Sequence, residues 1–141
     1  MSPPPALSVL TPVFRHDPTP IGQALAAACA TARARLEWVI VDDGSGDPAL
    51  AARLEALAAQ TAVRVRLIVL ARNGGRAAAR NRLVAEAQGR HVLFLDADMI
   101  PDDPAFAARW LALIDAEDPP AAFGGFSVAR APDLSATNGN L

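Results

Sequence analysis

Residues 91–98 have the sequence HVLFLDAD, and this stretch decides how the rest of the chain is interpreted. The apolar run 91–95 has the length and composition of a buried strand. Asp96 and Asp98 follow at once, so they stand at the C-terminal end of that strand. Two carboxylates there suit Mg²⁺ or Mn²⁺, which takes one or two protein carboxylates and fills its shell with water and phosphate oxygens. The alternative is a solvated turn or a helix cap.

Two junctions of the same kind lie upstream. EWVIV at 37–41 gives way to DDGSGDP at 42–48, where a carboxylate can accept hydrogen bonds from a base or ribose. VRVRLIVL at 63–70 becomes wholly apolar, which predicts a strand in the interior of the sheet. A loop and a helix N-terminus follow, and amide groups there, with arginines, favour binding of a diphosphate.

Strand and helix patterns alternate along the chain with short connections. We expect strands at 7–14, 37–41, 63–70, 91–95 and 121–128, and helices at 21–35, 48–60, 76–87 and from 103 onward. This order predicts an α/β fold with a mainly parallel sheet, helices on both faces and ligands at the C-terminal strand ends.

Single residues add local expectations. Asp47 before Pro48 predicts a helix N-cap, and Gly89 predicts a C-terminal cap. Cys29 is expected to be a small buried thiol. Four aromatic residues are expected to pack in the core: Trp38, Phe94, Phe106 and Trp110.

Composition narrows the function classes. The 141 residues, 52% of them hydrophobic, suffice for one domain with a core. A net charge of −2 argues against nucleic acid as a partner. All 13 basic residues are Arg, which excludes a lysine Schiff base and a phosphate loop ending in Gly-Lys. The single cysteine excludes an internal disulfide and a cysteine zinc site.

The sequence shows no leader pattern and no uncharged stretch long enough to cross a membrane. We therefore expect a cytoplasmic protein without a transmembrane segment in this chain. A peripheral position at a membrane surface, within a larger assembly, stays open.

Four segments in order, LSVLTPVF, VIVDDGSGD, NGGRAAARN and GRHVLFLDADM, resemble the family-two glycosyltransferases of the GT-A fold. The resemblance covers residues 7–99. It implies that residues 1–141 form a single domain, the Rossmann-like half that binds a nucleotide sugar, and that this domain is incomplete at its C-terminus.

The resemblance assigns roles on the base side of the donor. It implies that Thr11 and Pro12 line the nucleotide base and that Asp43 contacts it. Family members often have Tyr-Asn after the first-strand Pro-Val, whereas this chain has Phe14 and Arg15. Contacts that depend on that tyrosine hydroxyl or asparagine amide are therefore not transferred.

It also assigns roles on the phosphate side. Asn73, Arg76 and Arg80 fall where the family's loop and helix approach the nucleotide. Asp96 matches the carboxylate near the ribose and donor sugar, and Asp98 the one that binds the Mg²⁺ or Mn²⁺ bridging the diphosphate.

The implied reaction transfers a sugar from a nucleoside diphosphate donor, with UDP expected, to an acceptor hydroxyl with inversion. The catalytic residue is unknown, because the family's base comes from a segment further downstream and Asp133 follows DAD too soon to match it. We expect donor binding with little transfer by this polypeptide alone. The donor base and sugar, the acceptor and the oligomeric state are not predicted.

Three other functions fit parts of the sequence. A module that binds a nucleotide sugar without chemistry would need only the donor residues. A phosphatase could use Asp96 as nucleophile and Asp98 as acid, but it would carry that motif on an early strand. A nucleotidyltransferase would want a glycine-rich loop straight after the first strand, where this chain has TPVFRHDP.

Overall fold

The computed structural model describes residues 3–28, 35–59, 63–101, 103 and 105–121. Strands and helices alternate through them in the predicted order: β1 (Leu7–Val13), α1 (Thr19–Ala28), β2 (Leu36–Asp42), α2 (Pro48–Ala59), β3 (Arg64–Val69), α3 (Arg76–Glu86), β4 (His91–Phe94) and α4 (Phe106–Glu117). Cys29 and residues 122–128 of the expected fifth strand lie outside the described residues.

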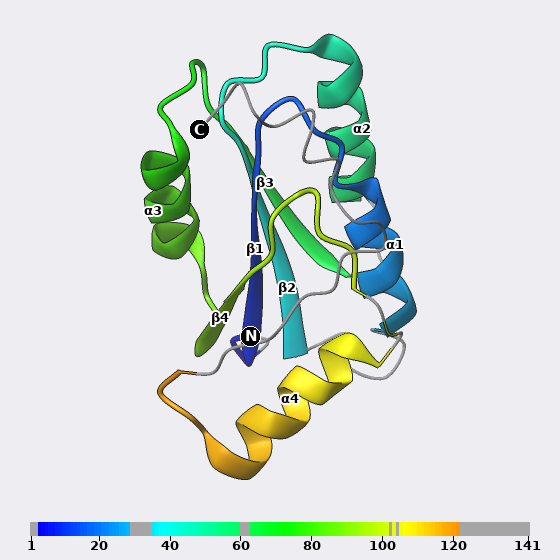
Figure 1. The fold of residues 1–141 in the computed structure, drawn as a ribbon, viewed down its shortest axis with the longest axis vertical. Helices are drawn as coiled ribbons and strands as arrows, with labels where there is room; N and C mark the ends of the chain where they lie inside the picture. Colours follow the sequence, from blue (N-terminus) through cyan, green and yellow to red (C-terminus); the bar gives the residue numbers. More distant parts are fainter. Residues whose placement is uncertain (1–2, 29–34, 60–62, 102, 104, 122–141) are drawn as a thin grey trace, which may run out of the picture.

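The four described strands form one parallel sheet in the order β3-β2-β1-β4. In Figure 1, α3 lies on one side of this sheet, α1 and α2 lie on the other, and α4 crosses near the N-terminal strand ends. This confirms the predicted parallel α/β sheet with helices on both faces. All strands point the same way, so their C-terminal ends meet at one edge of the sheet.

The prediction that residues 63–70 form an interior strand is wrong. Among the described strands β3 lies at an edge of the sheet and pairs only with β2. Its residues are half-buried or exposed, with Val69 58% exposed, whereas every residue of the neighbouring β2 is buried. Position in the sheet is therefore not encoded in its hydropathy.

Alternation along the strands divides the core into two layers. Side chains of one parity, such as Val9 and Trp38, pack with α1, α2 and α4. Those of the other parity, such as Leu10 and Val39, pack against Ala79 and Leu83 of α3. Each strand residue thus has a predictable face once one neighbour has been placed.

Helix ends follow local side-chain chemistry, with two corrections. Asp47 caps α2 as predicted, since its Oδ1 accepts from the amide nitrogens of Ala49 at 2.9 Å and Leu50 at 3.3 Å. Gly89, however, is not the cap of α3, which ends at Ala87. A Cβ on Gly89 would lie 2.6 Å from the backbone nitrogen of Ser8, so glycine is needed there for close approach to β1.

The helix expected from residue 103 begins later, at Phe106, because Asp103 turns the chain by accepting from the amide of Ala105 at 2.8 Å. Phe106 and Trp110 of this helix were expected in the core. Ala107, Leu111 and Ile114 are buried, whereas Phe106 and Trp110 pack against the core from partly exposed positions.

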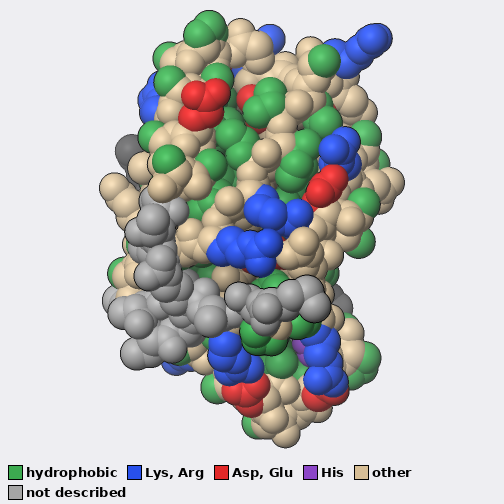
Figure 2. Space-filling view, turned by 180° about the vertical axis from the view of Figure 1, so that it is seen from behind, with side chains coloured by type: hydrophobic (Ala, Val, Ile, Leu, Met, Phe, Trp, Pro, Cys, Tyr) green, Lys and Arg blue, Asp and Glu red, His purple; other side chains and the backbone are tan. Residues whose placement is uncertain are grey.

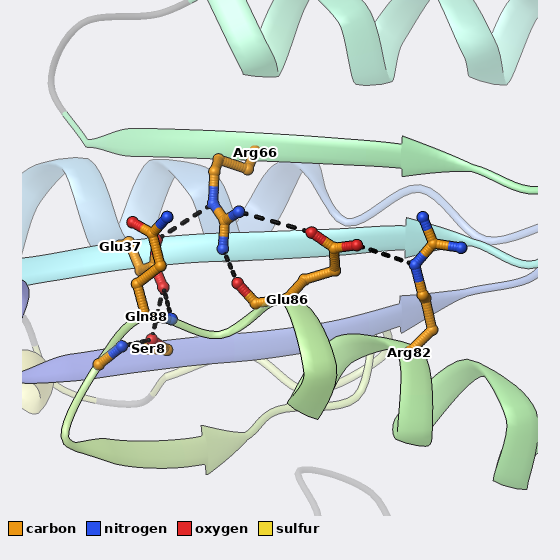
Figure 3. A network of polar contacts seen from close by, with 7 residues as sticks. Ser8, Glu37, Arg66, Arg82, Glu86 and Gln88 are labelled. Carbon is orange, nitrogen blue, oxygen red and sulfur yellow. Dashed lines mark hydrogen bonds and ion pairs between the residues drawn. The ribbon is translucent and has the colours of Figure 1, made fainter.

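A buried polar network joins the N-terminal halves of the strands to the end of α3 (Figure 3). Glu37 is fully buried, and its carboxylate accepts from Ser8 Oγ at 2.6 Å, Gln88 N at 2.7 Å and Arg66 Nε at 3.2 Å. Arg66 also donates to the Glu86 carbonyl oxygen. A buried charge needs such partners, and here they hold the α3–β4 connection against β1 and β2.

Surface charges are mostly paired. On the face seen in Figure 2, arginine side chains lie beside acidic ones at several places. Pairs of this kind include Arg82 with Glu86 and Arg90 with Asp118. None of the described helices combines the length and hydropathy that a membrane span requires.

One surface pair predicts a pH effect. Asp115 of α4 accepts two hydrogen bonds from Arg35, at 2.6 and 2.8 Å, and these hold the pKa of the Asp115 carboxyl below its usual range. The folded chain therefore binds this proton less readily than the unfolded chain, and the stability gained is present at neutral pH and lost as the pH falls below about 4. We expect Asp115→Asn to lower the free energy of unfolding at pH 7, and we expect the difference to be smaller at pH 3. Urea unfolding at both pH values checks this, and a pH-independent difference would contradict it.

Candidate functional site

A pocket of about 430 Å³ opens at the C-terminal ends of the strands. This is where parallel α/β sheets bind ligands, and the volume suits a small molecule. Seven of the eight residues selected from the sequence line it: Pro12, Asp43, Asn73, Arg76, Arg80, Asp96 and Asp98. They come from four segments of the chain, so only folding brings them together.

Thr11 is the exception. It is fully buried, and its Oγ1 accepts a hydrogen bond from Trp38 Nε1 at 2.9 Å. Thr11 shares the strand face of Val9 and Val13, whereas Pro12 points to the opposite face, that of α3 and the pocket. The structure therefore places Thr11 as support for Trp38 and not in the pocket lining.

Asp43 lies at the base of the pocket and is almost fully buried. Its Oδ1 accepts from Gly74 N at 2.8 Å, and its Oδ2 accepts from Gly75 N at 3.1 Å and Asn73 Nδ2 at 3.0 Å. A carboxylate has about four lone-pair positions. Oδ1 thus retains one acceptor position for a donor group in the pocket.

The neighbouring Asp42 stabilises the turn after β2. It lies on the opposite strand face, and its Oδ1 accepts from Ser45 N at 3.1 Å, which closes the turn after β2. The Ser45 hydroxyl in turn accepts from Arg15 N at 2.8 Å. The loops after β1 and β2 are therefore joined beside the pocket.

Arg15 is held in a left-handed conformation, with φ of 55°. This conformation costs a residue with a Cβ about 1 kcal/mol, and Asn adopts it more readily than other residues with a Cβ. The Arg15 guanidinium also lies 4.9 Å from the Phe14 ring centre, an exposed contact worth about 0.5 kcal/mol. We expect Arg15→Asn to raise the free energy of unfolding by about 0.5 kcal/mol, the difference between these two effects. Urea unfolding measures this, and His16→Asn, at a neighbour without positive φ, should give no such gain.

Helix α3 points its N-terminus at the pocket. Its N-cap is Gly75, with φ of 94° and no side chain that could occupy the amides of the first turn. Those amide groups and Arg76 are hydrogen-bond donors of the kind that suits an anion. Arg80, one turn later, donates to Asp96 Oδ1 at 3.1 Å.

Phe94, expected in the core, is 43% exposed. It lies on the α3 face of β4, and the Arg80 guanidinium carbon lies 5.5 Å from its ring centre. The aromatic ring therefore supports an arginine at the pocket instead of packing in the interior.

The carboxylates that could hold a cation are Asp96 and Asp98. No group of three or more His, Cys, Asp or Glu side chains comes together within the described ranges. Such a site fits Mg²⁺ or Mn²⁺ only when the ligand supplies further oxygens, which is how these ions bind with nucleotides.

Phe14 and His16 also line the pocket, although no motif in the sequence assigned either of them to the site. Phe14 is 45% exposed, so part of its ring is accessible to a ligand at the pocket. Its position directly after a strand was the only signal in the sequence that could have assigned it to the site.

Comparison with known proteins places this pocket in a family. A sequence profile described as glycosyl transferase family 2 matches residues 8–135. An N-acetylglucosaminyltransferase of Bradyrhizobium elkanii is 31% identical over 97 residues, which cover 68% of this chain and 53% of that protein. A dodecaprenyl-phosphate galacturonate synthase of Rhizobium johnstonii is 31% identical over 68% of this chain and 29% of its own length.

Solved structures agree on the fold. S. aureus TarS 1–349 in complex with UDP-GlcNAc matches with a TM-score of 0.67 and 27% identity, over 79% of this chain and 32% of that one. The mannosyltransferase PcManGT of Pyrobaculum calidifontis, in complex with GDP-Man and Mn²⁺, matches with a TM-score of 0.62 and 25% identity. The match covers 79% of this chain and 33% of that one.

The chain spans between 8% and 63% of the length of the curated relatives it matches. The match covers both the strand ends and the loops that form the pocket, and it sets aside the phosphatase and nucleotidyltransferase alternatives. The parallel sheet, its two-sided helices and the pocket at its C-terminal edge are the GT-A arrangement. The chain belongs to glycosyl transferase family 2.

Proposed function

We propose that this chain forms the donor site of an inverting glycosyltransferase that uses a nucleoside diphosphate sugar, with UDP as the preferred nucleotide. The observation that carries the proposal is the convergence of Asp43, Arg76, Asp96 and Asp98 on one pocket. It places a hydrogen-bond acceptor, a cationic helix end and two carboxylates within one small volume. A base, a diphosphate and a ribose or sugar need those three kinds of group.

Asp43 would bind the base. Its remaining acceptor position on Oδ1 suits the N–H of a uracil ring, and the carboxylate is already fixed by the loop 73–75. A carboxylate that does not have to reorganise on binding discriminates strongly against a base lacking that donor. This supports a uridine nucleotide over one without an N–H at that position.

Arg76 and the first amides of α3 would hold the diphosphate. They carry positive charge toward the pocket before any ligand arrives, so they stabilise the charge that develops on the leaving diphosphate. The oxygen of the acceptor hydroxyl would attack the anomeric carbon as the bond to the diphosphate oxygen breaks, and the hydroxyl proton would pass to a base that the described residues do not identify. Attack from the opposite side gives inversion.

A divalent cation would be bound through Asp98 and the diphosphate oxygens. When bound, the cation supplies Lewis-acid stabilisation of the leaving group. The side chains fit this because the pocket offers few protein ligands and leaves the rest of the shell to phosphate and water.

The test is calorimetric titration with UDP, with and without Mn²⁺. We expect binding that depends on Mn²⁺, and we expect Asp98→Asn to weaken it about tenfold because a charged ligand is lost. Asp115→Asn, which removes a carboxylate far from the pocket, serves as control and should leave the affinity unchanged. Equal losses in both variants would contradict the assignment of Asp98.

The second candidate is a module that binds a nucleotide sugar without transferring it. Asp43, Asp96 and Asp98 are the carboxylates among the described lining residues, and all three have roles toward the donor. An assay for release of UDP from UDP-sugar, with and without acceptors, separates the two candidates. Release that is stimulated by an acceptor favours transfer.

A further inference from the structure

The carboxylates of the pocket differ in how many protein donors already contact them. Asp43 is occupied by amide donors of the loop 73–75. Asp96 forms an ion pair with Arg80, with 3.1 Å between Oδ1 and Nη2. Asp98 is exposed and forms no ion pair with any residue that the structure describes. Among the carboxylates of the described lining, Asp98 is therefore the one with neither an ion pair nor a hydrogen-bond donor.

The Arg80 side chain is fixed from two sides. Its guanidinium lies over the ring of Phe94, 5.5 Å from the centre, and its Nη2 donates to Asp96. Both partners come from β4 and its continuation, two residues apart, so strand geometry aligns the ring and the carboxylate on the α3 face. Arg76, one turn earlier, also lines the pocket and has no such partner among the described residues.

We propose that Arg80 is the resident counter-ion of Asp96, and that the divalent cation consequently enters the site only together with the diphosphate. This inference rests on the proposed function, and it changes the role of Arg80 from a direct ligand of the nucleotide to a group that controls cation binding. In the nucleotide-free chain a cation meets one available carboxylate and a neighbouring positive charge.

Electrostatics gives the direction of the effect. A guanidinium beside the site repels a divalent cation and offsets part of the attraction of the carboxylates, even in water. Mg²⁺ and Mn²⁺ also give up their hydration reluctantly, so one carboxylate alone holds them weakly. The diphosphate adds several negative charges and oxygen ligands at once, so the net interaction of the site with the cation becomes attractive.

The experiment measures Mn²⁺ binding to the nucleotide-free chain by electron paramagnetic resonance of free Mn²⁺. We expect Arg80→Met to bind Mn²⁺ three- to tenfold more tightly than the unmodified chain, because Asp96 becomes available. Arg80→Lys, which keeps the charge, should stay close to the unmodified chain. Arg82→Met removes a charge from the same helix, but Arg82 pairs with Glu86 and not with a pocket residue. This variant should therefore leave the Mn²⁺ affinity unchanged.

A purely structural or phosphate-binding Arg80 gives a different result. Its removal would then leave Mn²⁺ binding unchanged or weaker in the absence of nucleotide, and that outcome overturns the inference. The same samples are titrated with UDP and Mn²⁺ together. Binding by the unmodified chain keeps the proposed function intact whatever Arg80→Met does, whereas no binding overturns the proposed function and this inference with it.

Discussion

Replacing Asp43 with Asn is expected to abolish UDP binding and to lower the free energy of unfolding by about 2–3 kcal/mol. The variant keeps the size of the side chain but turns an amide NH₂ toward donors. At least one of the three groups that now donate to Asp43, on Asn73, Gly74 and Gly75, would lose its acceptor in a nearly fully buried position. The acceptor position proposed for the base would be lost as well. Urea unfolding and calorimetric titration measure the two effects.

Asp47→Asn is the matched control. Asp47 caps α2 through hydrogen bonds from Ala49 and Leu50, and Asn caps helices about as well as Asp. Stability and UDP binding should both stay within about 0.5 kcal/mol of the unmodified chain. If Asp43→Asn were as mild as this control, the buried carboxylate would not be what holds the 73–75 loop.

Replacing Gly44 with Ala is expected to destabilise the fold by about 3–5 kcal/mol, since two separate penalties add. Gly44 has a φ of 70°, which disfavours any residue with a Cβ. Its added Cβ would also lie 2.3 Å from the carbonyl carbon of Arg72 and the backbone nitrogen of Asn73. Backbone atoms at that distance must move, and the loop they belong to carries the donors of Asp43.

Gly46→Ala separates the two penalties. Gly46 has a similar φ of 63°, but its added Cβ would meet no atom within 4 Å. Only the conformational penalty of about 1 kcal/mol remains. Thermal and urea unfolding of the two variants therefore measure how closely the loops after β2 and β3 approach, and equal losses would show that this approach is loose.

The order of strands and helices could be predicted because hydrophobic periodicity is a local property. Each of the runs 7–14, 37–41, 63–70 and 91–95 contains a strand of the sheet, and the helices between them have the predicted type. The helix of residue 103 onward was placed too early because Asp103 caps a turn before α4 begins. The edge position of β3 was missed because its sequence is as apolar as that of an interior strand, although its side chains are only half-buried or exposed.

The site could be located but not resolved by the sequence. Polar residues that follow three of the strands must meet at one edge of a parallel sheet, which brings Asp43, Arg76, Asp96 and Asp98 together. The burial of Thr11 was missed, although the apolar residues on either side, Val9 and Val13, share its strand face. Alternation could have separated Thr11 from Pro12, since it assigns neighbouring residues to opposite faces.

By itself the sequence determined the class of fold, the family and the edge of the sheet that forms the site, because periodicity, turn residues and ordered motifs are all read along one chain. Only the tertiary structure decided which carboxylate oxygens of the pocket are still available to a ligand. The pairing of Arg80 with Asp96, the occupation of Asp43 by the loop 73–75 and the close approach of Gly89 to Ser8 join residues 16, about 30 and 81 positions apart. Such contacts depend on distances of a few tenths of an ångström between separate segments, and no local pattern in the sequence carries that information.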